Sequence, residues 1–385
     1  MAILYNLGCK LNQYEGNCLL EKFSKFDNVV IVNTCCVTRE AEVKSQKKLR
    51  NAIRNFPGYK VVATGCACTL NREEFKFADE IIDLKERNEL IRDIFPEPKR
   101  ARYFLKIEDG CNQSCTFCVV SKLRTKVESK PGFIIQKEIE WAKSLGFKEI
   151  VLAGANIGLY GCDIGSSLSA LLKSLTQITN LPRIRLSSIE PQFITPEIIS
   201  VLKNLPFCPH FHIPVQSADD RILSLMGRRY NSEKLKKIIE LIIRNYSDAG
   251  LSGDIIVGFP GESEEEFYNT YNFIRENPFM HLHIFPYSPR PNTEAFSFGD
   301  TISSSIKKRR LWLLKELIQK KNYEFRLKMQ NRIFDVVVER KNGMAVGLAR
   351  NYIRIMLNGN FRERDLVLTR VERVTIEGTY GTVIA

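Results

Sequence analysis

The sequence predicts a mixed α/β protein of three parts: an N-terminal doubly wound α/β domain, a central partial (β/α)6 barrel and a small C-terminal β-barrel. Three observations lead to this fold class. The chain has 385 residues, which suits two to four domains of about 100 to 200 residues each. Apolar strand-like runs alternate with helical patterns as far as residue 288, and only short strand-like runs follow residue 331. A stretch rich in proline and charge, residues 95–100, interrupts the alternation and marks the first boundary.

The first domain is expected over residues 1–98. Its polar, periodic stretches separate three continuous β-rich runs of the kind buried in parallel sheets, at residues 2–7, 28–33 and 59–64. Two or three residues after each run comes a cysteine: Cys9, Cys35 and Cys66. The carboxyl ends of parallel neighbouring strands meet at one edge of a sheet, where such folds bind ligands, so these thiols are expected to hold one metal cluster. The alternative is that they are ordinary small apolar residues. Two further cysteines, Cys36 and Cys68, lie beside them, so the number of candidate ligands exceeds three.

The central domain is expected over residues 99–324. Six strand candidates recur at intervals that leave room for helices, at residues 102–107, 149–154, 183–188, 210–215, 253–259 and 281–287. Helical patterns fall at 133–145, 166–178, 196–204, 232–247 and 263–276, and a long helix is expected at 303–329. Six βα units suit a partial barrel, in which ligands bind at the carboxyl ends of the strands. A flat doubly wound sheet would produce the same pattern.

The last domain, residues 325–385, lies within the most basic part of the chain. Of the net charge of +13, residues 303–385 hold +10. Five short strand-like runs separated by Asn-Gly and Gly turns predict a small β-barrel of a size that often handles RNA. A basic module on a nearly neutral body indicates contact with a polyanion such as nucleic acid. A solvated basic helix is the alternative, because residues 303–330 supply nine of the basic side chains.

Composition places the protein in a reducing, cytoplasmic compartment. The 44% hydrophobic content excludes a disordered chain. No apolar window approaches the roughly 18 residues of a membrane span, and the first ten residues lack the pattern of a secretory signal. The chain has 11 cysteines, for which metal binding is the more frequent use where disulfides are rare.

The strongest chemical signal is the spacing C-x3-C-x2-C formed by Cys111, Cys115 and Cys118. Three cysteines within eight residues wrap one corner of an iron-sulfur cluster, whereas structural zinc usually needs a second C-x-x-C pair, and none follows closely. A 4Fe-4S cluster held by three thiolates has one iron without a protein ligand, and that iron can bind a substrate or cofactor. A redox-inert cluster or a zinc site is the alternative.

With Phe117 just before its third cysteine, this motif resembles the radical S-adenosylmethionine enzymes, in which the open iron binds S-adenosylmethionine and reduces it to a 5′-deoxyadenosyl radical. The resemblance covers at least residues 1–300 and is closest to the methylthiotransferases that modify N6-threonylcarbamoyladenosine in tRNA. The motifs that carry it are LGCKLNQYE (7–15), VNTCCVT (32–38), GC (65–66), LAGANIGLYG (152–161), RLSSIEP (185–191), HIPVQSADDRILSLMGRRY (212–230), GDIIVGFPGE (253–262) and HIFPYSPRP (283–291).

The resemblance implies two 4Fe-4S clusters and S-adenosyl-L-methionine as cofactors, with no catalytic side chain beyond the cluster-bound cofactor and sulfur. Cys111, Cys115 and Cys118 would hold the radical cluster. Cys9, Cys35 and Cys66 would hold an auxiliary cluster that presents the sulfur. One S-adenosylmethionine would methylate that sulfur, and a second would supply the radical that takes hydrogen from adenine C2. A radical route is reasonable because an unactivated aromatic C–H offers acid/base catalysis nothing to exploit.

The implied product is 2-methylthio-N6-threonylcarbamoyladenosine next to the anticodon. The implied partners are tRNA through its anticodon stem-loop, an electron donor such as flavodoxin or ferredoxin, and a sulfur source, with no membrane. The tail is similar to the TRAM-like RNA-binding β-barrel of these enzymes.

The family motifs also imply residues that contact S-adenosylmethionine, each near the end of a barrel strand or in the cluster loop. They are Phe117, Gly154, Asn156, Ser187, Ser188, Glu190, Gln216, Arg228 and Gly258. Ordinary turn chemistry is the alternative for the residues after the second and third strands. For Arg228 the alternative is a solvated or RNA-facing guanidinium.

Three residues depart from the family pattern after the radical motif. Ser121, Thr125 and Glu128 stand where proline, glycine and arginine are usual. The exchange at Glu128 bears on how RNA is held and leaves the cofactor chemistry untouched. The alternative functions are a methylthiotransferase acting on another modified tRNA adenosine or on a ribosomal-protein side chain, and a non-catalytic iron-sulfur RNA-binding sensor.

Overall fold

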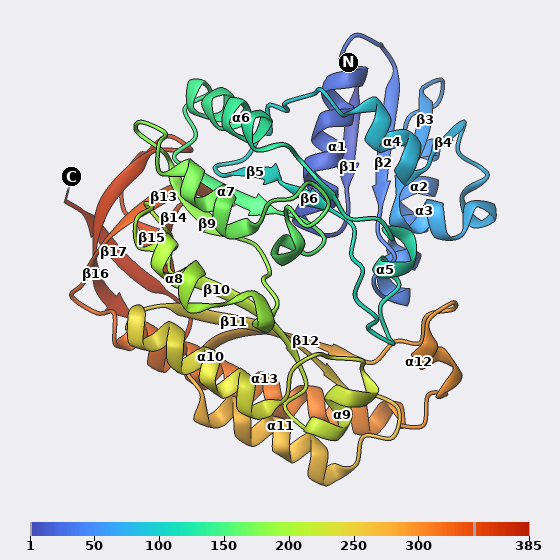
Figure 1. The fold of residues 1–385 in the computed structure, drawn as a ribbon. Coiled ribbons are helices and arrows are strands. Elements are labelled where there is room, and N and C mark those ends of the chain that lie inside the picture. The colour runs from blue at the N-terminus through green and yellow to red at the C-terminus, as the bar shows by residue number, and fades with distance from the viewer. Residues whose placement is uncertain (1, 342–343, 385) are drawn as a thin grey trace.

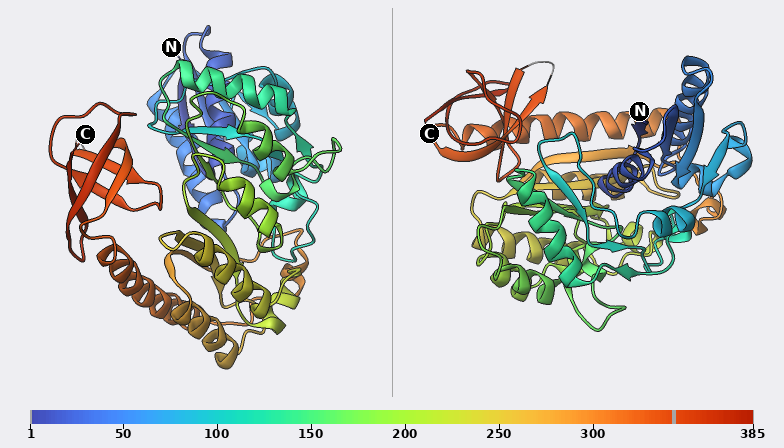
Figure 2. Two further views of the ribbon diagram at one scale, coloured as in Figure 1. Left: turned by 60° about the vertical axis from the view of Figure 1, so that its left-hand side comes forward. Right: turned by 90° about the horizontal axis from the view of Figure 1, so that it is seen from above.

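The computed structural model describes residues 2–341 and 344–384, which form a mixed α/β body with a closed β-barrel at one end (Figure 1). The predicted fold class is confirmed. Seen from above, the N-terminal sheet and the C-terminal barrel lie at opposite ends of the molecule (Figure 2). No helix in the described ranges is long and apolar enough to cross a membrane.

The N-terminal part is a parallel sheet in the order β1-β2-β3-β4. Its strands are β1 (Ile3–Asn6), β2 (Val29–Thr34), β3 (Lys60–Gly65) and β4 (Glu80–Ile82), of which the sequence patterns missed the last. Its helices are α1 (Lys10–Phe23), α2 (Arg39–Asn55), α3 (Cys66–Leu70) and α4 (Leu84–Leu90), with a 3-10 turn at Arg72–Phe75.

Helices cover both faces of this sheet because its strands are apolar on both sides. Val30 of β2 packs in one cluster with Leu49 of α2. Its neighbour Ile31 points the other way and packs with Leu19 of α1. The continuous apolar run that predicted a buried parallel strand therefore corresponds to a strand buried over its whole length.

Six parallel strands form the curved wall of the central partial barrel (Figure 1). They are β5 (Tyr103–Lys106), β8 (Glu149–Ala153), β9 (Arg183–Leu186), β10 (His210–Gln216), β11 (Gly250–Val257) and β12 (Phe279–Pro286). The first three and the last three pair as separate ladders, which two single bridges, Ile184 to Phe207 and Ser188 to His212, connect.

The helices between these strands match the predicted periodic stretches. They are α6 (Gly132–Ser144), α7 (Leu168–Leu175), α8 (Pro196–Leu202), α10 (Ser232–Asn245) and α11 (Glu264–Glu276). Shorter elements that the patterns missed are α5 (Val120–Leu123), α9 (Asp220–Leu225), α12 (Glu294–Ser297), 3-10 turns at Ile157–Leu159 and Pro191–Phe193, and a small hairpin of β6 (Glu108–Asp109) and β7 (Glu128–Ser129).

The long helix α13 (Ser304–Leu327) leads from the central barrel to the C-terminal one. The apolar residues Ile306, Leu314 and Ile318 recur at spacings of 8 and 12 and would share one helix face; Leu314 and Ile318 are buried against the central core, but Ile306 is 37% exposed. The closed barrel has the order β13-β14-β15-β17-β16. Its strands are β13 (Ile333–Lys341), β14 (Met344–Ala349), β15 (Arg354–Leu357), β16 (Leu366–Val374) and β17 (Thr379–Val383).

A buried ion network fastens this barrel to the central domain. Arg183 donates to the main-chain carbonyls of Asp335 at 2.7 Å and Leu348 at 3.2 Å. Arg185 donates to those of Arg350 at 2.8 Å and Ala349 at 3.2 Å. Both guanidinium groups pair with Glu149. Burial opposes the ionisation of Glu149, but the two arginines outweigh it and lower its pKa to about 2.

Some of the basic side chains of the C-terminal region therefore have structural roles. Arg364 donates to the main-chain carbonyls of Pro98, Arg100 and Leu145, and so holds the stretch expected to be a linker. Arg326 of α13 donates to the carbonyls of Thr375 and Ile376 in the turn before β17. Net charge alone overstates how many cations remain for a polyanion.

Candidate functional site

The structure brings Cys9, Cys35 and Cys66 together at the carboxyl edge of the N-terminal sheet. Cys9 caps α1 and its Sγ accepts the N–H of Asn12 at 3.5 Å, Cys35 follows β2, and Cys66 begins α3. Burial raises the pKa of Cys9, and the nearby Cys66 raises it further. Burial also raises the pKa of Cys35 to about 11, with Cys66 and Cys9 adding to the effect. The three thiols are thus close enough to influence one another.

Cys36 and Cys68 point into the apolar layer below this edge. Both are fully buried and pack with Leu49 of α2. Cys35 instead faces Gly8, where an added Cβ would lie 3.1 Å from its Sγ. A hydrogen bond from the Cys36 thiol lowers the pKa of Cys66 and raises that of Cys36. Cys36 thus belongs to the apolar cluster and contacts Cys66, whereas its neighbour Cys35 lies outside that cluster.

A buried network of charges lies next to these thiols, and the sequence patterns did not reveal it. Glu15 of α1, fully buried, pairs with Arg87 of α4, with Arg124 at 2.7 Å and with Lys106 of β5 at 2.8 Å. Burial opposes ionisation of Glu15, but these three cations lower its pKa to about 2. Arg124 and Arg87 also help lower the pKa of Cys66. The network ties the N-terminal sheet to the central barrel.

The radical-motif cysteines lie on the loop between β6 and α5, and main-chain bonds hold both ends of that loop. The N–H of Cys111 donates to the carbonyl of Arg124 at 2.8 Å, and the N–H of Thr116 to that of Met226 at 3.1 Å. Gly227 has φ +68°, and a Cβ there would lie 2.5 Å from the carbonyl oxygen of Ser114. A side chain at position 227 would therefore push the loop away.

Two side chains donate to the sulfur atoms of this loop. Arg228 Nη1 lies 3.0 Å from Cys115 Sγ, and Asn156 Nδ2 lies 3.8 Å from Cys111 Sγ. Arg228 also pairs with Glu190 at 2.9 Å. Burial raises the pKa of Cys115 to about 11, and the charge of Arg228 acts in the opposite direction. Donors and a cation at sulfur stabilise the thiolate, which is the form that binds iron.

Polar atoms without partners surround the same loop. Asn156 Oδ1, Ser187 Oγ and Glu108 Oε1 are buried and form no hydrogen bond within the described residues. An unsatisfied buried polar group costs about 1 to 3 kcal/mol. Three thiols, two of them with N–H donors, next to polar atoms that lack partners, fit an iron-sulfur cluster with a polar cofactor beside it.

Glu108 is a further polar residue that the motifs did not single out. It is 1% exposed, and its Oε2 accepts the N–H of Asn156 at 2.8 Å. Burial raises the pKa of Glu108 to about 8. Gly154 makes this position possible, because a Cβ there would lie 2.4 Å from Glu108 Oε2. The sequence does contain a signal that could have revealed Glu108: it is an acidic residue at the end of the first barrel strand, directly before the cysteine loop.

The remaining expected cofactor contacts lie in different surroundings. Gln216 has φ +64° at the end of β10, and Phe117 packs edge-on against Phe259. Ser188 is exposed. Gly258, with φ +70°, has a packing reason of its own: a Cβ there would lie 2.4 Å from the side chain of Lys307.

A cavity of about 250 Å³ is bordered by Cys118 and by the segment that follows Cys35 and Cys36. Val37 and Thr38, which follow the Cys35-Cys36 pair, line one side. Phe117 and Cys118 of the radical loop line another, and side chains of β10, β11 and β12 complete the wall. Both cysteine-bearing regions thus border one space at the carboxyl ends of the barrel strands, where α/β barrels bind ligands.

The chain is similar to two protein families and to several characterised proteins. The Radical SAM superfamily matches residues 105–274, and the uncharacterized protein family UPF0004 matches residues 2–85. The threonylcarbamoyladenosine tRNA methylthiotransferase MtaB of Aquifex aeolicus is 34% identical, over 92% of this chain and 95% of its own. That of Thermotoga maritima is 34% identical, over 96% and 94%. The tRNA-2-methylthio-N(6)-dimethylallyladenosine synthase of Buchnera aphidicola is also 34% identical, over 86% and 87%.

Among solved structures, the radical S-adenosylmethionine methyltransferase TsrM of Kitasatospora setae shares the fold. Its TM-score is 0.56 at 13% sequence identity, covering 73% of this chain and 68% of that one.

Proposed function

The chain belongs to the tRNA methylthiotransferase family of radical S-adenosylmethionine enzymes, and we propose that it methylthiolates C2 of N6-threonylcarbamoyladenosine next to the tRNA anticodon, using two 4Fe-4S clusters. The product is 2-methylthio-N6-threonylcarbamoyladenosine. The names of the similar Aquifex and Thermotoga enzymes support this substrate. The Buchnera enzyme, equally identical but named for a dimethylallyl substrate, defines the alternative that an experiment must separate.

The observation that carries the proposal is that Arg124 joins both sets of cysteines. Its carbonyl accepts the N–H of Cys111, and its guanidinium lies near enough to Cys66 to help lower that thiol's pKa. A methylthio transfer needs a radical source and a sulfur source facing one substrate, and the cavity bordered by Cys118 and by the segment after Cys35 and Cys36 provides that space. A sensor would need one cluster only.

In this proposal Cys111, Cys115 and Cys118 hold the radical cluster. A 4Fe-4S cluster on three thiolates leaves one iron open and supplies the reductive cleavage of S-adenosylmethionine. Arg228 and Asn156 hold the thiolates by donating to sulfur. Asn156 Oδ1 and Ser187 Oγ offer hydrogen-bonding atoms to the polar groups of the cofactor. Glu190, held by Arg228, is placed to accept from hydroxyl groups.

Cys9, Cys35 and Cys66 hold the second cluster in this proposal. Arg124 and Arg87 keep the neighbourhood of Cys66 positive, which favours the thiolate that iron requires. Cys36 supports Cys66 through its hydrogen bond and stays in the core.

The C-terminal barrel binds the tRNA backbone in this proposal. Arg362, Arg370 and Arg373, called here the barrel arginines, are exposed and form no ion pair with any described residue. Such cations neutralise phosphates and release counterions on binding.

The test is anaerobic turnover with S-adenosylmethionine and a reductant. Anticodon stem-loops carrying a threonylcarbamoyl or an isopentenyl group, and a ribosomal protein, are compared by mass spectrometry. A methylthio mass gain on the threonylcarbamoyl loop with formation of 5′-deoxyadenosine is the expected result. A mass gain on another substrate alone would refute the assigned substrate. If neither product formed, the non-catalytic sensor would be the remaining function.

A further inference from the structure

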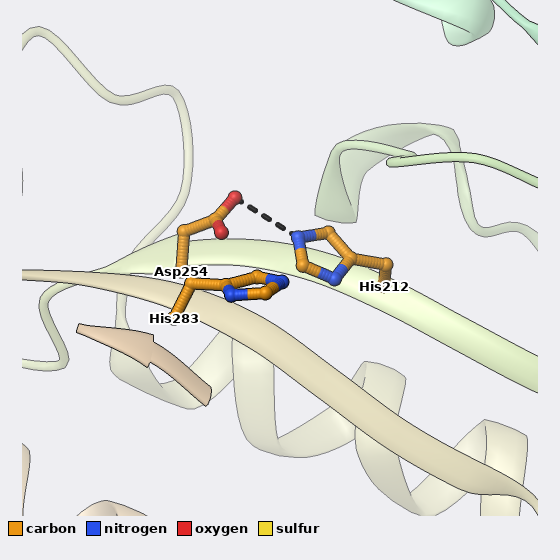
Figure 3. Close-up of side chains that lie close together, drawn as sticks. All are labelled: His212, Asp254 and His283. Atoms are coloured by element: carbon orange, nitrogen blue, oxygen red, sulfur yellow. Dashed lines mark hydrogen bonds and ion pairs between the residues drawn. The ribbon is translucent and has the colours of Figure 1, made fainter. Parts of the chain in front are cut away.

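All four histidines of the chain lie on two strands of the barrel wall: His210 and His212 on β10, and His281 and His283 on β12. Three side chains from neighbouring strands converge there, His212, Asp254 of β11 and His283 (Figure 3). His212 Nε2 lies 3.0 Å from Asp254 Oδ2, and one nitrogen or oxygen of each of the three lies within 4.8 Å of the others. We call these three residues the histidine triad.

The triad stands where two cavities approach each other. Asp254 lines the cavity of about 250 Å³ that Cys118 also lines. His283 lines a larger cavity of about 590 Å³, whose other walls include Tyr352 and Arg354 of the C-terminal barrel region. A substituent on a base held near Cys118 that extends toward the basic barrel would pass this point. No other role in the proposed chemistry uses these side chains.

Within the triad, two members already have partners and one is free. His212 has hydrogen-bond partners at both ring nitrogens, Asp254 and the Ser252 hydroxyl at 3.0 Å. Ser252 lies in turn 2.9 Å from His210. His283 is exposed to the cavity and forms no hydrogen bond with the described residues. Its imidazole N–H is therefore available to a ligand, in a position fixed by its neighbours.

Charges of both signs lie near this site. Partial loss of solvent in the cavity lowers the pKa of His283, the charge of Asp254 acts in the opposite direction, and Lys10 of α1 lowers the pKa further with a smaller effect than that of Asp254. Burial lowers the pKa of His281 to about 4, with His283, His212 and Arg354 adding to the effect. The triad therefore offers one neutral imidazole donor, His283, and its one carboxylate, Asp254, is engaged by His212. Lys10 lies near His283, and Arg354 lies near the neighbouring His281.

We propose that His283, positioned by His212 and Asp254, binds the carboxylate of the threonylcarbamoyl group and so selects that substrate over adenosines with apolar N6 substituents. This inference rests on the proposed function. A hydrogen bond from a fixed donor to a charged acceptor discriminates strongly, because the analogue that lacks the acceptor leaves the donor unsatisfied. An isopentenyl group carries no atom that His283 could bind.

The test compares two anticodon stem-loops, one with the threonylcarbamoyl group and one with its methyl ester, which removes the charge and adds one methyl group. Holoenzyme with equal iron content is used throughout. The wild-type kcat/KM is expected to be roughly tenfold or more higher for the acid than for the ester. His283→Leu should lower kcat/KM for the acid roughly to that of the ester and change the ester little. His283→Gln, which keeps an N–H donor, should recover part of the preference.

His281→Leu is the matched control, since it removes an imidazole from the same strand face outside the triad, and the acid-to-ester ratio should stay at the wild-type value. Equal effects of His283→Leu on acid and ester, or loss of the ratio in His281→Leu alone, would overturn the assignment. The assignment would also be overturned if the wild-type holoenzyme held one equivalent of zinc and the His283→Leu variant held none, because the triad would then bind a metal. Wild-type turnover of the isopentenyl loop alone would overturn the inference and the proposed function together.

Discussion

Replacing Glu149 by glutamine should loosen the C-terminal barrel. The side chains of Arg183 and Arg185 are 2% and 1% exposed, and glutamine would leave both without the carboxylate they share. Removing one partner of a buried ion pair costs about 3 to 5 kcal/mol. Asp335 lies 3.5 Å from Arg183 and offsets part of the loss, so the lower value is expected. With a slope of about 3 kcal/mol per molar urea, the midpoint of the transition should fall by roughly 1 M.

Urea unfolding followed by circular dichroism measures this shift. Limited trypsin digestion adds a local reading, because Lys328 and Arg332 lie between α13 and β13 and should be cut faster when the barrel loosens. The matched control is Glu197→Gln, which removes an exposed pair with Lys173 and should leave both readings unchanged. Identical midpoints and cleavage rates for the two variants would refute the view that this network holds the barrel in place.

Three further outcomes are expected. Cys35→Ala should lower bound iron from about eight to about four per chain while Cys36→Ala keeps both clusters, as iron analysis would show; the reverse pattern would refute the assignment. Exchanging the barrel arginines for glutamine should weaken tRNA binding. The slope of the logarithm of the binding constant against the logarithm of the salt concentration should become shallower by about 0.7 to 0.9 for each phosphate that is no longer neutralised. An unchanged slope would show that the RNA binds elsewhere. Burial raises the pKa of Glu108 to about 8, so folding stability should fall as pH rises from about 4.5 to 8, where the unfolded chain loses a proton that the folded one keeps. The difference in unfolding temperature between Glu108→Gln and the wild type should therefore shift in favour of the variant as the pH rises from about 5.5 to 8, at equal iron content. A difference that stays constant over this range would count against the prediction.

The fold was predictable where apolar periodicity is strong. Continuous runs such as residues 28–33 and 149–154 become buried parallel strands, and the change of pattern after residue 331 becomes a closed barrel. Short elements were missed because three or four residues carry no period: β4 and α5 are examples. Ile306 shows the limit of spacing arguments, because the buried face of α13 passes through Lys307 and Arg310 instead of the apolar Ile306.

The positions of the cysteines could be anticipated because strand-end chemistry is local in sequence. Cys9, Cys35 and Cys66 each follow a strand, and the parallel order of those strands brings them together. The contact between Arg228 and Cys115 joins residues 113 positions apart, and no local pattern announces it. The histidine triad depends in the same way on the pairing of three strands, because its members come from separate βα units.

Arg124 explains why the two cysteine sets cannot shift independently. It follows Cys118 by six residues, and its side chain pairs with Glu15, which follows Cys9 by six residues. Both groups are buried, so moving one domain relative to the other would break this pair, although Glu15 would keep Arg87 and Arg124 would keep Asp109. The cost is therefore below that of removing one partner of a buried pair outright, about 3 to 5 kcal/mol. The proposed transfer between the two sets of cysteines requires a constant separation. The buried pair supplies that constraint at the boundary of the two domains, where a flexible linker would not.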